Sequence, residues 1–294
     1  MRRAERGWGT RLTLLQDIRT PSWADDRSAL RAACEPGVGL CTIVGIEGSF
    51  SRRLGAQLAV APNGTITGSL ADGCLERQLA SEVASAKGPV VKRFGAGSEL
   101  IDFRLPCGSG LDVLIDPEPD REACRATVDR LDRREAAALP LPSQHLPERR
   151  YVPGLRLLLF GEGPEQEALA TLAATTGLEV ESRGKDTLSL GRRPAGLSAD
   201  PWTAVVLLFH DHEWEIPILE WALETPAFHI GAQGGHEARR ARLGHLAENG
   251  ATIDQLARIR SPVGLIPRTR EPGVLALSVL AEIVGEYEAL HPHG

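Results

Sequence analysis

The second half of the chain alternates continuous apolar runs with helix-like segments, and this pattern restricts the fold more than any other feature. Residues 155–160 (LRLLLF) form an unbroken apolar run, as expected for a parallel strand that is covered on both faces. Further strand-like runs occupy 178–182, 203–209 and 227–232. Helices are predicted between and after them, over 164–176, 216–224, 236–249, 254–259 and 272–289. Such alternation is typical of a Rossmann-like, doubly wound parallel sheet.

The first part of the chain has a different pattern. Residues 41–50 (CTIVGIEGSF) form a β-type run, and alternating apolar residues flank Asn63–Gly64, a strong hairpin signal. Apolar residues recur at helical spacing over 74–86. We also expect a short helix at about 26–33 and strands over 89–94 and 111–115. The sequence therefore predicts a small N-terminal α/β domain with a mixed sheet and one central helix.

A polar, proline-rich stretch separates the two parts. Residues 140–153 (PLPSQHLPERRYVP) have the composition of a linker, and a helix is predicted before them over 121–138. We therefore divide the chain into an N-terminal domain over 1–120, a connector over 121–153 and a C-terminal domain over 154–294. The length of 294 residues suits two domains.

Charge and apolar content exclude several classes of protein. The net charge of -6 argues against a general nucleic-acid binder. No stretch of 18 apolar residues is present, so no membrane span is expected. The basic N-terminus is not followed by the apolar region of a signal peptide, and we expect a cytoplasmic protein.

The five cysteines all lie before residue 125, and none are spaced as C-x-x-C, which argues against zinc ribbons and thioredoxin motifs. Cys74 follows Gly73 at the start of a predicted helix, where the helix N-terminus favours a thiolate. Cys107 lies in a loop before Gly108. Cys74 is either a reactive group or a small packing residue, whereas Cys107, between Pro106 and Gly108 in a loop, has little reason to belong to a core. Plain packing is the favoured interpretation for the remaining three, Cys34, Cys41 and Cys124.

Arg52 lies in a glycine-bounded loop over 48–55. An arginine there can clamp a phosphate or a carboxylate with two hydrogen bonds, and the alternative is a solvated turn.

Gly161 and Gly163 lie between a predicted strand and a predicted helix, where backbone amides can cradle a phosphate. Glu181, about 20 residues further on, could bind a ribose. Gln166 replaces the small residue of a dinucleotide fingerprint, and Glu162 adds negative charge, which favours a turn that binds no dinucleotide.

His210 and His212 follow the strand predicted over 203–209. They are placed at its carboxyl end, where ligands bind in open α/β sheets, and imidazoles there can bind a metal or transfer protons. The alternative is a polar loop without function. We expect the thiol loops and this imidazole loop to face one ligand across a shared cleft.

Taken in order, these segments resemble the XdhC/CoxI family of accessory proteins of xanthine dehydrogenase and CO dehydrogenase. The resemblance spans roughly residues 29–118 and 154–285. The motifs that carry it are Gly48-Ser49-x-x-Arg52-x-x-Gly55-Ala56, Gly68-Ser69 through Gly73-Cys74-Leu75-Glu76, Arg93-Phe94-Gly95, Leu105-Pro106-Cys107-Gly108, Gly161-x-Gly163, His210-Asp211-His212, Ile230-Gly231-Ala232-x-Gly234 and Pro262-x-Gly264-Leu265.

The resemblance implies a chaperone for molybdenum cofactor (molybdopterin), a carrier more than a catalyst. Such a protein binds the cofactor while a cysteine desulfurase adds a sulfur ligand, and passes it to an apo molybdenum hydroxylase. Family members are typically cytoplasmic homodimers. The resemblance places the cofactor at Cys74 and Cys107, which could contact molybdenum, and at Arg52, Gly73, Gly108, Gly161, Gly163, His210 and His212.

Two other functions stay open. Gly161, Gly163 and Glu181 could serve an NAD(P)-dependent oxidoreductase, although Pro164 and Gln166 depart from the family's pattern at this turn. The chain could also be a non-enzymatic module that holds an apo-enzyme.

Overall fold

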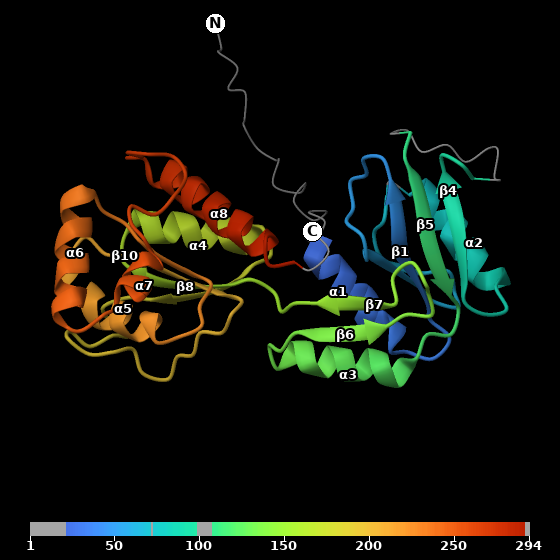
Figure 1. The fold of residues 1–294 in the computed structure, drawn as a ribbon, viewed down its shortest axis with the longest axis horizontal. Coiled ribbons are helices and arrows are strands. Elements are labelled where there is room, and N and C mark those ends of the chain that lie inside the picture. Colours follow the sequence, from blue (N-terminus) through green and yellow to red (C-terminus); the bar gives the residue numbers. More distant parts are fainter. Residues whose placement is uncertain (1–21, 72, 99–107, 292–294) are drawn as a thin grey trace, which may run out of the picture.

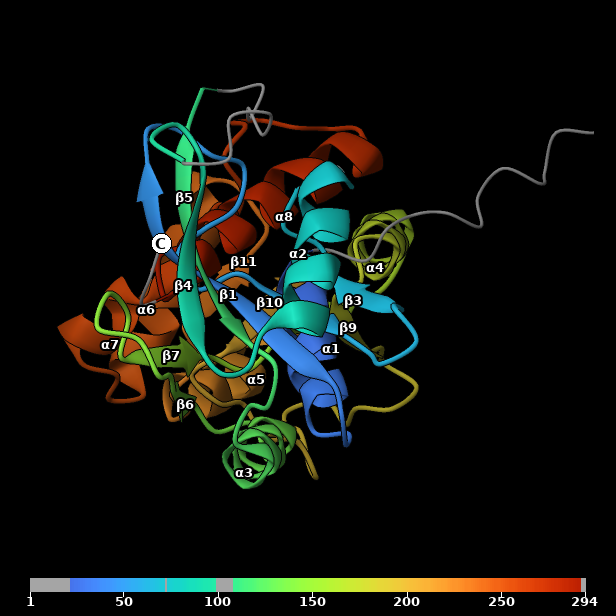
Figure 2. The same ribbon diagram turned by 90° about the vertical axis from the view of Figure 1, so that its right-hand side faces the viewer.

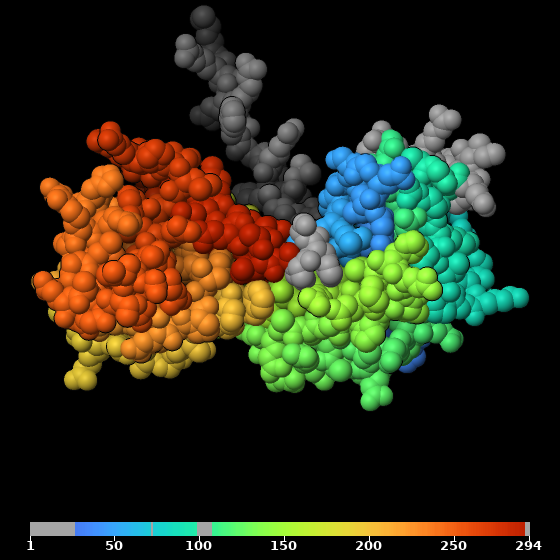
Figure 3. All heavy atoms as spheres, viewed as in Figure 1, coloured from blue at the N-terminus to red at the C-terminus, as the bar shows by residue number. Residues whose placement is uncertain are grey.

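The computed structural model describes residues 22–71, 73–98 and 108–291, and they form two units that lie side by side along the long axis (Figures 1 and 3). The N-terminal unit is built on a five-stranded sheet in the order β3-β2-β1-β5-β4, with every neighbouring pair antiparallel. Its strands are β1 (Gly39–Glu47), β2 (Gln57–Val60), β3 (Ile66–Gly68), β4 (Val90–Gly95) and β5 (Gly110–Asp116). The predicted hairpin at Asn63–Gly64 joins β2 to β3 and is confirmed.

Both faces of this sheet are covered. Helix α2 (Cys74–Ser85) packs on one face, and it lies in front of the sheet in Figure 2. Alternate residues of β1 explain this double burial, because Cys41 and Ile43 face α2 whereas Leu40 belongs to the core on the other face. That second core is closed by α1 (Ser22–Ala33) and α3 (Arg121–Asp132).

Residues 121–153, which we expected to form a connector, carry regular structure. Helix α3 ends at Asp132, earlier than predicted, and Arg134 follows with a positive φ of 59°. The chain then forms an antiparallel hairpin of β6 (Ala137–Pro140) and β7 (Glu148–Tyr151). This hairpin packs into the same core as α1 and α3, through Ala137, Leu139 and Tyr151. The division of the chain into domains stays a prediction.

The C-terminal unit confirms the Rossmann-like prediction. Its five strands lie in the order β12-β11-β10-β8-β9, and all neighbouring pairs are parallel. They are β8 (Arg156–Gly161), β9 (Glu179–Arg183), β10 (Thr203–Leu208), β11 (His229–Ala232) and the two-residue β12 (Ile259–Arg260), which was not predicted. The sequence order reverses between β8 and β10, the position at which doubly wound sheets bind ligands.

Helices cover both faces of this parallel sheet (Figure 1). Leu157 and Leu159 of β8 pack against α4 (Pro164–Thr175) and α8 (Pro272–Glu288). Leu158 and Phe160 face the opposite core, which α5 (Glu215–Leu223) and α6 (His236–Glu248) close together with the short α7 (Ile253–Ala257). Among the helices of the described residues, none combines the length and apolar character needed to cross a bilayer.

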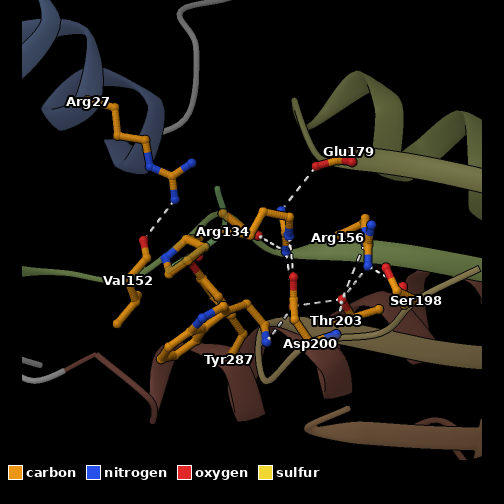
Figure 4. A network of polar contacts seen from close by, with 12 residues as sticks. Arg27, Arg134, Val152, Arg156, Glu179, Ser198, Asp200, Thr203 and Tyr287 are labelled. Carbon is orange, nitrogen blue, oxygen red and sulfur yellow. Dashed lines mark hydrogen bonds and ion pairs between the residues drawn. The ribbon is translucent and has the colours of Figure 1, made fainter. Parts of the chain in front are cut away.

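A polar network joins the two units (Figure 4). The Arg134 guanidinium donates to the Asp200 carboxylate and, over 3.0 Å, to the Gly154 carbonyl, and it pairs with Glu179 at 3.1 Å. The Tyr287 hydroxyl donates to the Pro153 carbonyl over 2.7 Å. Gly154 and Asp200 shortly precede β8 and β10. The amino ends of the parallel strands therefore lie against the N-terminal unit, and their carboxyl ends point away from it.

Candidate functional site: two separate loop clusters

The first cluster is the loop between β3 and α2, and one buried carboxylate shapes it. Glu76 is 6% exposed. Its carboxylate accepts hydrogen bonds from the backbone amides of Leu70 (3.1 Å), Ala71 (2.6 Å) and Gly73 (2.7 Å). Burial alone would raise the pKa of Glu76, but these amides and its own backbone amide outweigh burial and lower it. The loop is therefore folded around the carboxylate of Glu76, an anion that the protein itself supplies.

This loop presents Cys74 to solvent at the first position of α2. Gly73, directly before it, has a φ of 99°, a conformation that favours glycine. The Arg77 guanidinium lies one helical turn further on and donates to the Cys74 sulfur over 3.4 Å. An exposed thiol beside a cation at a helix N-terminus has the surroundings of a reactive cysteine.

Arg52 fastens a second loop to the first. Its Nε donates to the Ser69 carbonyl over 3.1 Å, and Nη2 lies 3.3 Å from the Ser69 hydroxyl. The Arg52 guanidinium is therefore held by hydrogen bonds to Ser69, and it is not simply solvated. A phosphate would have to use the donors that these two hydrogen bonds leave.

The third loop enters β5 through Gly108, which is exposed and has a φ of 69°. The Ser109 hydroxyl donates to the carbonyl of Ser49, so this loop touches the loop that carries Arg52. The pairing of Glu47 with Gly110 puts the end of β1 beside the start of β5. Three glycine-rich loops therefore meet at one end of the sheet. Cys107 lies outside the described residues.

The remaining cysteines have the surroundings of packing residues, as expected. Cys41 and Cys124 are fully buried, and burial raises the pKa of each thiol to about 12. Cys34 is half-buried and donates to the Leu30 carbonyl, and burial also raises its pKa.

The second cluster lies at the carboxyl ends of β8 and β10. Gly161 packs so tightly that a Cβ atom there would lie 2.8 Å from the carbonyl carbon and oxygen of Leu208. Gly163 precedes α4 with a φ of 88°. Lys185 Nζ lies 3.6 Å from Glu162 Oε2 and 3.8 Å from Asp211 Oδ2, so the lysine charge is shared between two carboxylates.

Glu181, the predicted ribose ligand, pairs with Arg183. A pyrophosphate at the glycine turn would therefore meet carboxylates, and the acidic group expected to bind its ribose is already engaged. Both observations weigh against dinucleotide binding.

The two candidate histidines differ in how they are held. The His210 side chain is 73% exposed, with Nε2 3.5 Å from the Glu165 carboxylate. His212 is half-exposed, and its Nδ1 lies 3.0 Å from the buried carboxylate of Glu215. The described residues contain no cluster of three or more His, Cys, Asp or Glu side chains placed to hold a metal ion.

The expectation of one shared cleft is wrong for a single chain. The amino ends of β8 and β10 face the N-terminal unit, whereas Gly161, Gly163, His210 and His212 follow their carboxyl ends. The six residues of β8 alone separate the two ends by about 20 Å. The structure thus brings Arg52, Gly73, Cys74 and Gly108 together at one end of the molecule and the glycine turn and histidines at the other.

Sequence reasoning missed the side chains that hold both clusters in place. Glu76 stands three residues after Gly73, the spacing of a capping box, and this signal could have identified it. Arg77 follows Cys74 by three residues, a spacing that brings side chains together on a helix, so the helix predicted over 74–86 could have identified it. Arg242 has no comparable signal, because only the fold brings it to Glu215 across 27 residues.

Comparisons with known proteins identify the family of the chain. Residues 32–95 match the model of the XdhC and CoxI family, and residues 157–283 match that of the XdhC Rossmann domain. The molybdenum cofactor insertion chaperone PaoD of Escherichia coli K12 is 35% identical over 286 residues, which cover 88% of each chain.

Two more distant matches complete the comparison. The uncharacterized protein YqeB of Escherichia coli K12 is 24% identical over 83% of this chain and 42% of its own length. A crystal structure described as a xanthine dehydrogenase from Bacillus halodurans superposes with a TM-score of 0.69 at 21% identity, covering 91% of this chain and 97% of that chain. At that identity the likeness concerns the fold.

Proposed function

Because the chain belongs to the XdhC and CoxI family, we propose that it binds molybdenum cofactor and inserts it into an apo molybdenum hydroxylase of the xanthine or CO dehydrogenase type. In this proposal the protein is a cytoplasmic homodimer. It protects the cofactor while a cysteine desulfurase supplies the sulfur ligand. The cofactor is cargo, and the protein is a carrier.

The observation that carries the proposal is the exposed Cys74 thiol on a loop whose backbone amides donate to the buried Glu76 carboxylate. A thiolate is a soft ligand that suits molybdenum or a sulfur-transfer intermediate. Arg77 supplies a cation beside the sulfur, and the spare donors of Arg52 can meet a phosphate. Cys107, which precedes Gly108 in the sequence, is the proposed second thiol. The identity to a molybdenum cofactor insertion chaperone supports the same assignment.

The competing oxidoreductase proposal has less support. Its glycine turn is flanked by Glu162, Glu165 and Asp211, and Glu181 pairs with Arg183. We therefore assign the cargo to the thiol end of the molecule.

The test measures retention of cofactor by the full chain. Wild type, Cys74→Ser and the Cys74→Ser/Cys107→Ser variant are purified from cells that make the cofactor, and the cofactor is quantified by its fluorescence after oxidation. We expect retention to fall severalfold in Cys74→Ser and further in the double variant, with a parallel loss of activation of an apo-hydroxylase.

Cys34→Ser is the matched control, because it removes a half-buried thiol from the same unit and is expected to retain cofactor like wild type. If the double variant retained as much cofactor as wild type, Cys74 and Cys107 would not be part of the binding site. If a variant that has lost the cofactor still captured the apo-hydroxylase like wild type, the partner would bind at a surface separate from the thiol loops.

A further inference from the structure

The N-terminal unit has a cavity of about 430 Å³ on the face of its sheet that is turned away from α2. The floor of this cavity is formed by Leu40 and Thr42 of β1 and by Leu114 and Asp116 of β5. Leu40 pairs with Asp116, and Thr42 pairs with Leu114. Alternate residues of a strand point to the same face, so the four side chains are direct neighbours. The sheet thus places one carboxylate between two leucines at the bottom of the cavity.

The walls of the cavity add apolar surface and further negative charge. Leu139 of β6 lines one wall, and proline rings line others, at Pro89, Pro119, Pro140 and Pro142. Two more carboxylates, those of Glu118 and Asp120, belong to exposed residues and therefore lie toward the mouth. Among the described residues that line the cavity, none is basic. The cavity is therefore apolar in its walls and acidic at both its floor and its mouth.

The carboxylate at the floor is only partly satisfied. Asp116 is 7% exposed, and its Oδ1 accepts a hydrogen bond from the Glu118 amide over 3.1 Å. The charge of Arg121 acts on Asp116, but the Arg121 guanidinium donates to the carbonyls of Ala33 (2.8 Å) and Val38 (3.2 Å) instead. Burial raises the pKa of Asp116 above its ordinary value of 3.8. Within the described part of the chain, no side chain donates to Asp116, so Oδ2 is left for a donor that enters the cavity.

This lining favours a cation that is carried on an apolar chain. A guanidinium is planar, weakly hydrated and able to donate two parallel hydrogen bonds to a carboxylate. The methylene groups behind it match apolar walls. An anion would meet three carboxylates, and a purely apolar group would leave Oδ2 of Asp116 buried without a donor.

We infer that this cavity is a docking site for an arginine side chain that a segment of a partner protein inserts. Asp116 accepts hydrogen bonds from the guanidinium, and the leucines and prolines cover its methylene groups. Glu118 and Asp120 extend the negative charge to the mouth, where the basic segment that carries the arginine lies. Helix α2 packs on the opposite face of the sheet, so docking here does not cover Cys74 at its start.

The test titrates the full chain, with 13C-labelled leucine methyl groups, with a capped pentapeptide that carries one arginine between alanines. The comparison peptide contains citrulline, which keeps the shape of arginine but has no charge. We expect the arginine peptide to shift the methyl resonances of Leu40, Leu114 and Leu139. The citrulline peptide should bind about tenfold more weakly, because it loses a charge-assisted hydrogen bond. The isosteric Asp116→Asn variant should bind the two peptides equally.

Asp129→Asn is the matched control, since Asp129 is an exposed aspartate of α3 outside the cavity lining. It removes the same charge from the same unit and should keep the preference for arginine. The comparison of the two peptides on wild type does not depend on the folding of any variant.

Equal binding of the two peptides by wild type, unshifted resonances of the three leucines, or an unchanged preference in Asp116→Asn would each overturn the inference. Binding of free propylguanidine as tightly as the arginine peptide would also overturn it, because the site would then take a small cation and not a protein segment. None of these measurements involves cofactor, so this inference and the proposed function can fail separately.

Discussion

At the scale of single residues, Glu76 connects stability to the candidate site. Its carboxylate satisfies three amides of the loop that presents Cys74. These amides would otherwise be left unpaired in a partly buried loop, which costs free energy. Glu76 thus holds the loop in its conformation, whereas Cys74 is the residue that the loop exposes to solvent.

The first prediction concerns this carboxylate. The pKa of Glu76 is lower in the folded protein than its ordinary value of 4.5, so its contribution to stability is complete above about pH 4.5 and is lost as the pH falls toward the folded pKa. We expect Glu76→Gln to lower the free energy of unfolding by about 1–3 kcal/mol at pH 7. Urea titrations at pH 7 and pH 4 measure this loss, which should shrink at pH 4.

Glu122→Gln is the matched control, because Glu122 is an exposed glutamate in the first turn of α3. It should change the free energy of unfolding by less than about 0.5 kcal/mol. A loss for Glu76→Gln that is as small as that of the control would show that the amide contacts contribute nothing.

At the scale of elements, the turn from β8 into α4 depends on the absence of a side chain. Gly161 lies against the backbone of Leu208 on the neighbouring strand, and backbone atoms cannot rotate away as a flexible side chain can. The glycine therefore allows β8 and β10 to remain paired up to their last residues, where Leu208 is opposite Gly161.

The second prediction compares two glycines. Gly161→Ala should lower the free energy of unfolding by about 1–3 kcal/mol, because its Cβ atom would overlap the Leu208 backbone. Gly285→Ala should raise it by about 0.5–1 kcal/mol, because Gly285 is exposed within α8 and has open space around it. Thermal unfolding of both variants checks the opposite signs. Equal shifts in the same direction would contradict the packing argument.

The elements with strong periodicity could be predicted from the sequence. The helical spacing in 74–86 and the apolar run of 155–160 correspond to α2 and β8 within one or two residues. β6 and β7 were missed because Pro140 and the polar residues 148–150 resemble a linker, and only burial of alternate residues against α3 makes them strands. β12 has two residues, too few for any period.

At the scale of the whole molecule, Arg134 is the principal polar link between the units (Figure 4). Its positive φ turns the chain sharply after α3, and its guanidinium reaches the segments before β8 and β10. Burial would raise the pKa of Asp200, but the hydrogen bonds from Arg134 and Thr203 outweigh it, so the pKa is lowered. The pair therefore stabilises the junction above the ordinary pKa of 3.8, and this stabilisation is lost as the pH falls below it.

The third prediction is a coupling between these two residues. A double-mutant cycle with Arg134→Ala and Asp200→Asn should give a coupling free energy of about 1–3 kcal/mol at pH 7 and a smaller value at pH 3. The exposed pair of Arg133 and Glu135 should couple by less than about 0.5 kcal/mol. Denaturant unfolding measures both cycles, and equal coupling in the two pairs would refute a special role for Arg134.

The arrangement of the two loop clusters could not be predicted from the sequence. Local pattern places His212 at the carboxyl end of a strand and Cys74 at the start of a helix, and both placements are confirmed. Which edge of the parallel sheet faces the N-terminal unit depends on contacts such as that of Arg134 with Asp200, which are 66 residues apart. Such contacts leave no periodic signal.

Because the two loop clusters lie at opposite ends of the molecule, they differ in which binding partners can reach them. A macromolecule seated on the thiol loops and one seated on the carboxyl edge of the parallel sheet would not compete for space, because the whole C-terminal sheet lies between them (Figures 1 and 3). In the proposed function, a partner that delivers or receives the cargo therefore has to approach the thiol loops, and the carboxyl edge of the parallel sheet stays uncovered while that partner is bound.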